Sequence, residues 1–131
     1  MDKQDKTSIL VLDDEPIVLK RLQPALERAG YTVETFSRSA DAFDRVDGKT
    51  FDIVITDLKM EGSDGMAFLT HVKKRAPKTE VIVITGFATM DTAKESFKKG
   101  VFDFLAKPFK LGELLEAVKK AEARIKADKN A

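Results

Sequence analysis

The chain has 131 residues, of which 43% are hydrophobic and 34% charged, so it fits a single domain with a packed core. Lys and Arg number 23 against 22 Asp and Glu, and the resulting net charge of +1 does not favour a nucleic-acid groove or an anionic membrane surface. The absence of cysteine excludes disulfides, thiolate zinc sites and cysteine nucleophiles. No apolar run approaches the ~18 residues of a membrane span and no signal peptide is recognisable, so we expect a cytoplasmic protein.

Short apolar runs alternate along the chain with longer amphipathic segments. The runs cover residues 9–12, 31–36, 51–56, 81–85 and 102–106. The first, third and fourth are rich in β-branched residues and almost continuously apolar, which is typical of parallel strands buried on both faces. The second alternates between apolar and polar residues, which indicates a strand at the edge of the sheet.

The segments between these runs have the apolar spacing of helices. The predicted helices cover residues 16–29, 39–46, 65–75, 91–99 and 111–126. Five strand–helix units in succession predict an α/β fold, a doubly wound (βα)5 sandwich in which five helices flank a five-stranded parallel sheet.

Polar side chains follow four of the five predicted strands. Asp13 and Asp14 follow the first and Asp57 the third, Thr85 ends the fourth, and Lys107 follows the fifth. Ligands of open parallel sheets bind beyond the carboxyl ends of the strands, so we expect these side chains at one edge. Close carboxylates repel one another unless a cation intervenes, and Mg²⁺ is the hard cation that leaves room for a phosphate. Lys107 and Thr85 suit phosphoryl oxygens, and the single Asp57 is the predicted nucleophile.

Each of these residues, taken alone, has an ordinary structural explanation. Asp13 suits a loop, Asp14 could cap the helix that begins at Pro16, Thr85 suits the end of a strand, and Lys107 suits the surface. Their joint occurrence at four strand ends favours the functional interpretation.

Four segments resemble, in their order and spacing, the receiver domain of two-component response regulators. They read ILVLDDEP, DIVITDLKMEGSDGMAFL, VIVITGFA and KKGVFDFLAKPF. The similarity covers residues 7–123, and the last part is most like receivers of enhancer-binding transcription activators or hybrid kinases. It implies the flavodoxin-like strand order 2-1-3-4-5, which the chemotaxis member of this family has. We expect a flexible N-terminus over residues 1–7, the receiver over 8–124, and a charged tail or linker start over 125–131.

The resemblance implies a role for each residue of the acidic edge. Asp57 would accept the phosphoryl group, and Lys107 would hold one of its oxygens. Asp14 would bind Mg²⁺ directly, Asp13 would bind it through a water molecule, and Lys59 would contribute its backbone carbonyl.

The resemblance also marks residues around this edge. Thr85 and Phe104 would form a switch pair, the hydroxyl moving toward the phosphate and the ring turning inward; an ordinary strand aromatic is the alternative for Phe104. The Lys107–Pro108 bond is usually cis in relatives. Glu61 stands where relatives usually have proline, which predicts a more flexible loop or altered metal affinity. Phe87 either shields the acyl phosphate from water or is a partly exposed loop aromatic.

The predicted function is a phosphorylation-activated switch rather than a turnover enzyme. A sensor histidine kinase or phosphotransfer protein would donate the phosphoryl group, and the fourth helix, fifth strand and fifth helix would change their partner or homodimer contacts. We expect neither direct nucleic acid contact nor membrane contact.

A degenerate receiver that acts as a phosphorylation-independent binding module is the main alternative. A metal-dependent phosphatase is disfavoured because Lys59 stands where its general acid would be, and a nucleotide or flavin binder because no Gly-rich loop follows the first strand.

Overall fold

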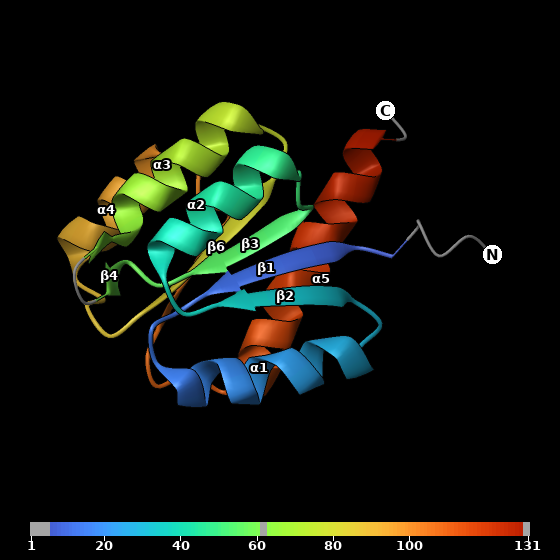
Figure 1. Ribbon diagram of the computed structural model, residues 1–131, viewed down its shortest axis with the longest axis horizontal. Helices are drawn as coiled ribbons and strands as arrows, with labels where there is room; N and C mark the ends of the chain where they lie inside the picture. The colour runs from blue at the N-terminus through green and yellow to red at the C-terminus, as the bar shows by residue number, and fades with distance from the viewer. Residues whose placement is uncertain (1–5, 61–62, 130–131) are drawn as a thin grey trace.

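A parallel sheet with helices on both faces forms the centre of the computed structural model, which describes residues 6–60 and 63–129 (Figure 1). The strands of this sheet are β1 (Ser8–Leu12), β2 (Thr32–Phe36), β3 (Ile53–Thr56), β6 (Glu80–Thr85) and β7 (Asp103–Ala106). The helices are α1 (Pro16–Arg28), α2 (Ser39–Gly48), α3 (Gly65–Arg75), α4 (Met90–Lys98) and α5 (Leu111–Lys129). The order β2-β1-β3-β6-β7 is the predicted 2-1-3-4-5, so the predicted fold class is confirmed.

Burial of the strands follows the hydrophobic pattern of the sequence. Every residue of β3 and β6 is buried, and so is all of β1 after Ser8. The edge strands β2 and β7 are half-buried or exposed throughout, as the alternating pattern of residues 31–36 predicts for the first of them. The central strands therefore hold their carboxyl ends in a rigid, dry frame.

Alternate side chains of the strands enter two hydrophobic cores, one on each face of the sheet. On one face Ile9 and Val11 pack with the apolar sides of α1 and α5, and on the other Leu10 and Leu12 pack with those of α2 and α3. Figure 1 shows α1 and α5 on the first side, and α2, α3 and α4 on the second. The two cores therefore hold in place the helices that follow the strand ends where the predicted site residues lie.

Two short strands were missing from the sequence-based prediction. They are β4 (Lys59–Met60) and β5 (Ser63–Asp64), which pair antiparallel just after the end of β3. Strands of two residues are too short to show a hydrophobic period, so no pattern could indicate them. Glu61 lies outside the described residues, and its predicted effect on this loop stays a prediction. None of the helices in the described ranges is long and apolar enough to cross a membrane.

The C-terminal half of α5 is attached to the opposite end of the sheet from the predicted site. Glu122 accepts hydrogen bonds from Thr7 Oγ1 at 2.7 Å and from the Tyr31 hydroxyl at 3.1 Å. Arg124 pairs with the buried Glu80 at 3.2 Å. These contacts join α5 to the beginnings of β1, β2 and β6, because each partner lies next to or within one of those strands.

Candidate functional site

Asp13 is held rigidly at the carboxyl end of β1. Its backbone N–H donates to the carbonyl of Phe36 at 3.0 Å, and its side chain is fully buried. One carboxylate oxygen, Oδ1, accepts from the backbone N–H of Glu15 at 2.9 Å. The other, Oδ2, lies 2.8 Å from Lys107 Nζ in an ion pair, yet it accepts no well-aligned hydrogen bond from residues 6–60 or 63–129. A buried carboxylate oxygen thus keeps a lone pair available.

Asp57 follows the central strand β3 and is 4% exposed. Its backbone N–H donates to the carbonyl of Leu12 at 3.1 Å, which fixes it beside the end of β1. Its Oδ1 accepts from the backbone N–H of Lys59 at 3.2 Å, and its Oδ2 accepts from Lys107 Nζ at 2.9 Å. Donors therefore already surround the carboxylate that is predicted to react.

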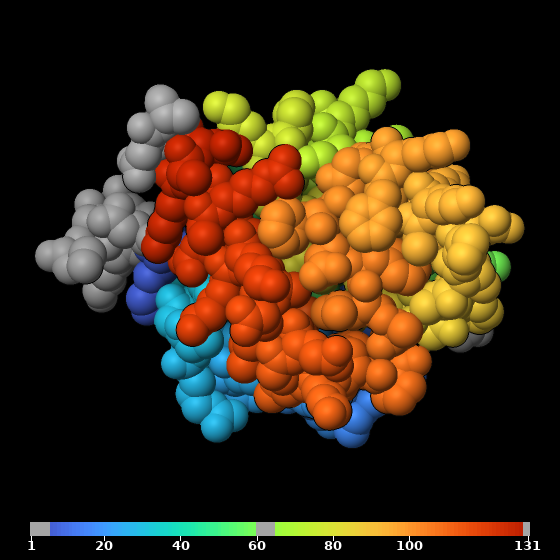
Figure 2. All heavy atoms as spheres, turned by 180° about the vertical axis from the view of Figure 1, so that it is seen from behind, coloured from blue at the N-terminus to red at the C-terminus, as the bar shows by residue number. Residues whose placement is uncertain are grey.

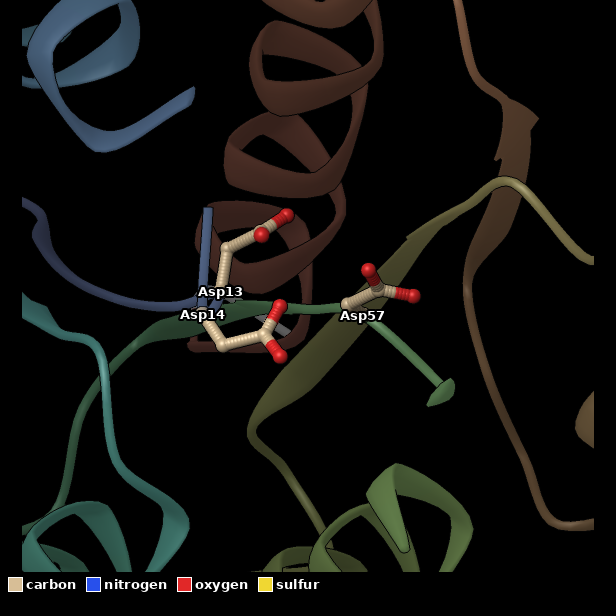
Figure 3. A group of neighbouring side chains, drawn as sticks. All are labelled: Asp13, Asp14 and Asp57. Carbon is tan, nitrogen blue, oxygen red and sulfur yellow. The ribbon is translucent and has the colours of Figure 1, made fainter. Parts of the chain in front are cut away.

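Asp13, Asp14 and Asp57 form one cluster, as their positions after neighbouring parallel strands predict (Figure 3). Each offers a carboxylate oxygen, and these oxygens lie within 4.8 Å of one another. Hard divalent cations such as Mg²⁺ take ligands of this kind, and the unused lone pair of Asp13 Oδ2 fits such an ion. The N-cap residue of α1 is Glu15 rather than Asp14, and the Glu15 side chain makes no capping hydrogen bond.

Burial and neighbouring charged groups shift the pKa values of Asp13 and Lys107. Burial raises the pKa of Asp13 and the charge of Asp57 adds to the rise, whereas contact with Lys107 and with the Glu15 N–H opposes it. Burial alone would lower the pKa of Lys107, but its close contacts with Asp13, Asp57 and Glu15 outweigh burial and raise that pKa. Lys107 is consequently a permanent ammonium group.

Thr85 is the last residue of β6 and is fully buried. Its hydroxyl accepts from the backbone N–H of Phe87 at 3.0 Å, and its carbonyl accepts from the backbone N–H of Lys107 at 2.8 Å. Thr85 is thus tied through the backbone to the lysine that contacts Asp57. The Lys107–Pro108 bond is cis, which confirms the prediction.

The remaining predicted residues lie around the cluster. Phe104 is half-buried in β7 and packs against the core that α2 and α3 cover. Phe87 is 55% exposed, and the Lys59 ammonium lies 5.4 Å from the centre of its ring. The structure places these residues without testing their roles, so the switch pair and the shielding role of Phe87 stay predictions.

One charged neighbour of the site was missed by the sequence reasoning. Glu15 Oε1 lies 2.5 Å from Lys107 Nζ, across 92 residues of chain. In the sequence, only the position of Glu15 directly after Asp13 and Asp14 hints at a role in the site. That position does not reveal which way the side chain points.

Comparison with known proteins agrees with this arrangement. The family described as Response regulator receiver domain matches residues 9–119. The chain belongs to this family. The receiver domain is 35% identical over 113 residues to the DNA-binding transcriptional regulator NtrC of Escherichia coli (strain K12), a match that covers 86% of this chain and 24% of NtrC. It thus spans about a quarter of that relative, and its likeness to receivers of transcription activators is confirmed.

Solved structures share the fold of this receiver domain. The beryllofluoride-activated NtrC4 receiver domain dimer is 34% identical with a TM-score of 0.84, over 90% of this chain and 98% of that one. A response regulator from Burkholderia pseudomallei with a phosphorylated aspartic acid, calcium ion and citrate is 26% identical with a TM-score of 0.81. That match covers 95% of this chain and 73% of the other.

Proposed function

We propose that this receiver domain is a phosphorylation-activated switch of a two-component system in the cytoplasm. Asp57 takes a phosphoryl group from the phosphohistidine of a sensor histidine kinase or phosphotransfer protein. The observation that carries the proposal is the setting of Asp57, a buried carboxylate 2.9 Å from the Lys107 ammonium and clustered with Asp13 and Asp14. The Burkholderia pseudomallei regulator, which holds a phosphorylated aspartic acid and a calcium ion, supports it.

The transfer uses the charges of this site. A carboxylate oxygen of Asp57 attacks phosphorus, the P–N bond to the donor imidazole breaks, and the leaving nitrogen keeps the electron pair and is then protonated. The Lys107 ammonium offsets the negative charge that develops on the phosphoryl oxygens. Asp14, Asp57 and the Lys59 carbonyl would hold Mg²⁺ directly and Asp13 would hold it through water, and the ion would supply positive charge to the acidic cluster.

The switch proceeds from the site through Thr85. Its hydroxyl accepts from the Phe87 N–H, and turning toward the phosphoryl group would release that N–H and loosen the start of the loop before α4. We propose that the ring of Phe104 turns inward in the same step, as the resemblance implies. Hydrolysis of the acyl phosphate by the domain itself is slow, so the receiver is a regulator and not a turnover enzyme.

The surface that changes would be the α4–β7–α5 face, seen in Figure 2 with α5 in red beside α4 in orange. Helix α4 is largely exposed, and Ser96 is its one buried residue. The exposed fraction is 73% for Met90 and 51% for Phe97 on α4, and 55% for Phe87 in the loop before it. We propose that this apolar surface meets a partner or a second copy, which the NtrC4 receiver dimer supports. Sedimentation with and without beryllofluoride tests the second copy.

Acetyl phosphate with Mg²⁺, followed by mass spectrometry, tests the proposed phosphorylation. We expect a gain of one phosphoryl group that is lost in Asp57→Ala and kept in Asp44→Ala, which removes an exposed acid from α2. Failure of the wild-type protein to gain mass would favour the binding-module alternative. Continuous release of phosphate without accumulation on the protein would instead favour a phosphatase.

A further inference from the structure

We propose that Glu15 is a positioning residue that holds the Lys107 ammonium in the unphosphorylated receiver and gives it up to the phosphoryl group. The inference rests on the proposed function and concerns the regulation of the same site. Of the three ion pairs that Lys107 Nζ makes with residues the structure describes, the one with Glu15 is the shortest, at 2.5 Å, against 2.8 Å for Asp13 and 2.9 Å for Asp57.

The backbone of Glu15 has a structural role that its side chain does not share. Its N–H donates to Asp13 Oδ1 at 2.9 Å, and its carbonyl accepts from Val18 N–H at 3.0 Å in the first turn of α1. The side chain makes no capping hydrogen bond to α1. It turns instead toward Lys107, so the helix does not depend on the carboxylate.

A phosphoryl group on Asp57 would compete with carboxylates for the same ammonium group. In the described part of the chain, Lys107 Nζ pairs with Asp13, Glu15 and Asp57. Phosphorylation turns the Asp57 carboxylate into a neutral acyl group and puts a more negative phosphoryl group beside Lys107. The stronger attraction of Lys107 to that group weakens its pairs with Asp13 and Glu15.

The solvent exposure of each carboxylate decides which ion pair with Lys107 breaks. The Glu15 side chain is 55% exposed, whereas those of Asp13 and Asp57 are 0% and 6% exposed. Leaving a carboxylate without its cation costs little where water can solvate it and much where it is buried. Glu15 is consequently the partner that gives way.

The surroundings provide room for this movement. Glu15 and Lys107 both line a hollow of about 390 Å³, together with Val18, Arg21 and Phe109. The guanidinium of Arg21 lies over the Phe109 ring, 5.3 Å from its centre. The hollow offers space for the displaced Glu15 side chain, and Arg21 contributes positive charge to it.

Beryllofluoride, which mimics a phosphoryl group, tests the proposal on the full chain with Mg²⁺. Because Glu15 competes for Lys107, we expect Glu15→Gln to bind it about two- to fivefold more tightly, the range that a partly exposed ion pair provides. Glu15→Asp should also bind more tightly, since its side chain is one methylene shorter and the pairs with Asp13 and Asp57 keep the ammonium from following it. Glu27→Gln removes the same charge from an exposed position on α1 and should bind like wild type.

The binding results separate the role of Glu15 from the proposed function of the domain. Equal affinities in all variants would overturn the role of Glu15 while leaving the proposed function intact, whereas failure of the wild type to bind beryllofluoride would overturn both. Tighter binding by Glu15→Gln but wild-type binding by Glu15→Asp would show a general charge effect and overturn the specific contact. A nitrogen NMR signal of the Lys107 ammonium, recorded without ligand, checks the pair directly. It should change in Glu15→Gln and not in Glu27→Gln, and an unchanged signal would overturn the proposal.

Discussion

Tyr31 provides a direct test of how α5 is attached to the sheet. Burial, together with the charge and hydrogen bond of Glu122, raises the pKa of Tyr31 from 10.0 to about 12. This rise corresponds to about 3 kcal/mol of stability at 1.36 kcal/mol for each pH unit. Because the pKa is higher in the folded state, that stability is fully present below pH 10 and is lost as the pH rises from 10 to about 12.

The measurement is simple because Tyr31 is the only tyrosine and the chain has no tryptophan. Ultraviolet absorbance of the tyrosinate therefore follows this one residue, while circular dichroism at each pH shows that the fold persists. We expect a midpoint near 12 in the wild type. In Glu122→Gln the midpoint should fall but stay above the ordinary value, since burial remains.

Glu116→Gln, at an exposed position of the same helix, is the matched control and should leave the midpoint of Tyr31 unchanged. A wild-type midpoint at the ordinary value, or the same midpoint in Glu122→Gln, would refute the reasoning.

The pKa of Glu122, the hydrogen-bond partner of Tyr31, shifts in the opposite direction. Burial alone would raise this pKa, but hydrogen bonds from Thr7 and Tyr31 and the charge of Lys126 lower it. Its contribution to stability is present above pH 4.5 and is lost as the pH falls through the lowered value.

Two further predictions concern the loops around Asp57. Gly65→Ala should destabilise the fold by about 1–3 kcal/mol in denaturant titrations, because a Cβ at this position would collide with the backbone carbonyl of Asp57. Gly112→Ala has open space in α5 and should instead be neutral or stabilising by up to about 1 kcal/mol; equal effects would refute the steric argument. If Phe87 shields the acyl phosphate, Phe87→Glu should speed its decay, measured by mass spectrometry, whereas Phe97→Glu on α4 should not. An unchanged decay rate in Phe87→Glu would rule shielding out.

Much of the acidic site was predictable because parallel strands align their carboxyl ends. Asp13, Asp14 and Asp57 directly follow two strands that lie side by side, so the chain path brings their carboxylates together. Lys107 follows β7 by one residue and reaches the same edge for the same reason. Periodicity could not show the β4–β5 pair, because strands of two residues carry too little pattern.

By itself the sequence determined the α/β class, the burial of the central strands and the acids at their ends, since these depend on local spacing and on the handedness of strand crossovers. The tertiary structure alone decided which side chains pair across the chain. Glu15 meets Lys107 across 92 residues, and Tyr31 meets Glu122 across 91. Such contacts depend on where packed helices direct long polar side chains and on how deeply each group is buried, and neither quantity is encoded in residue spacing.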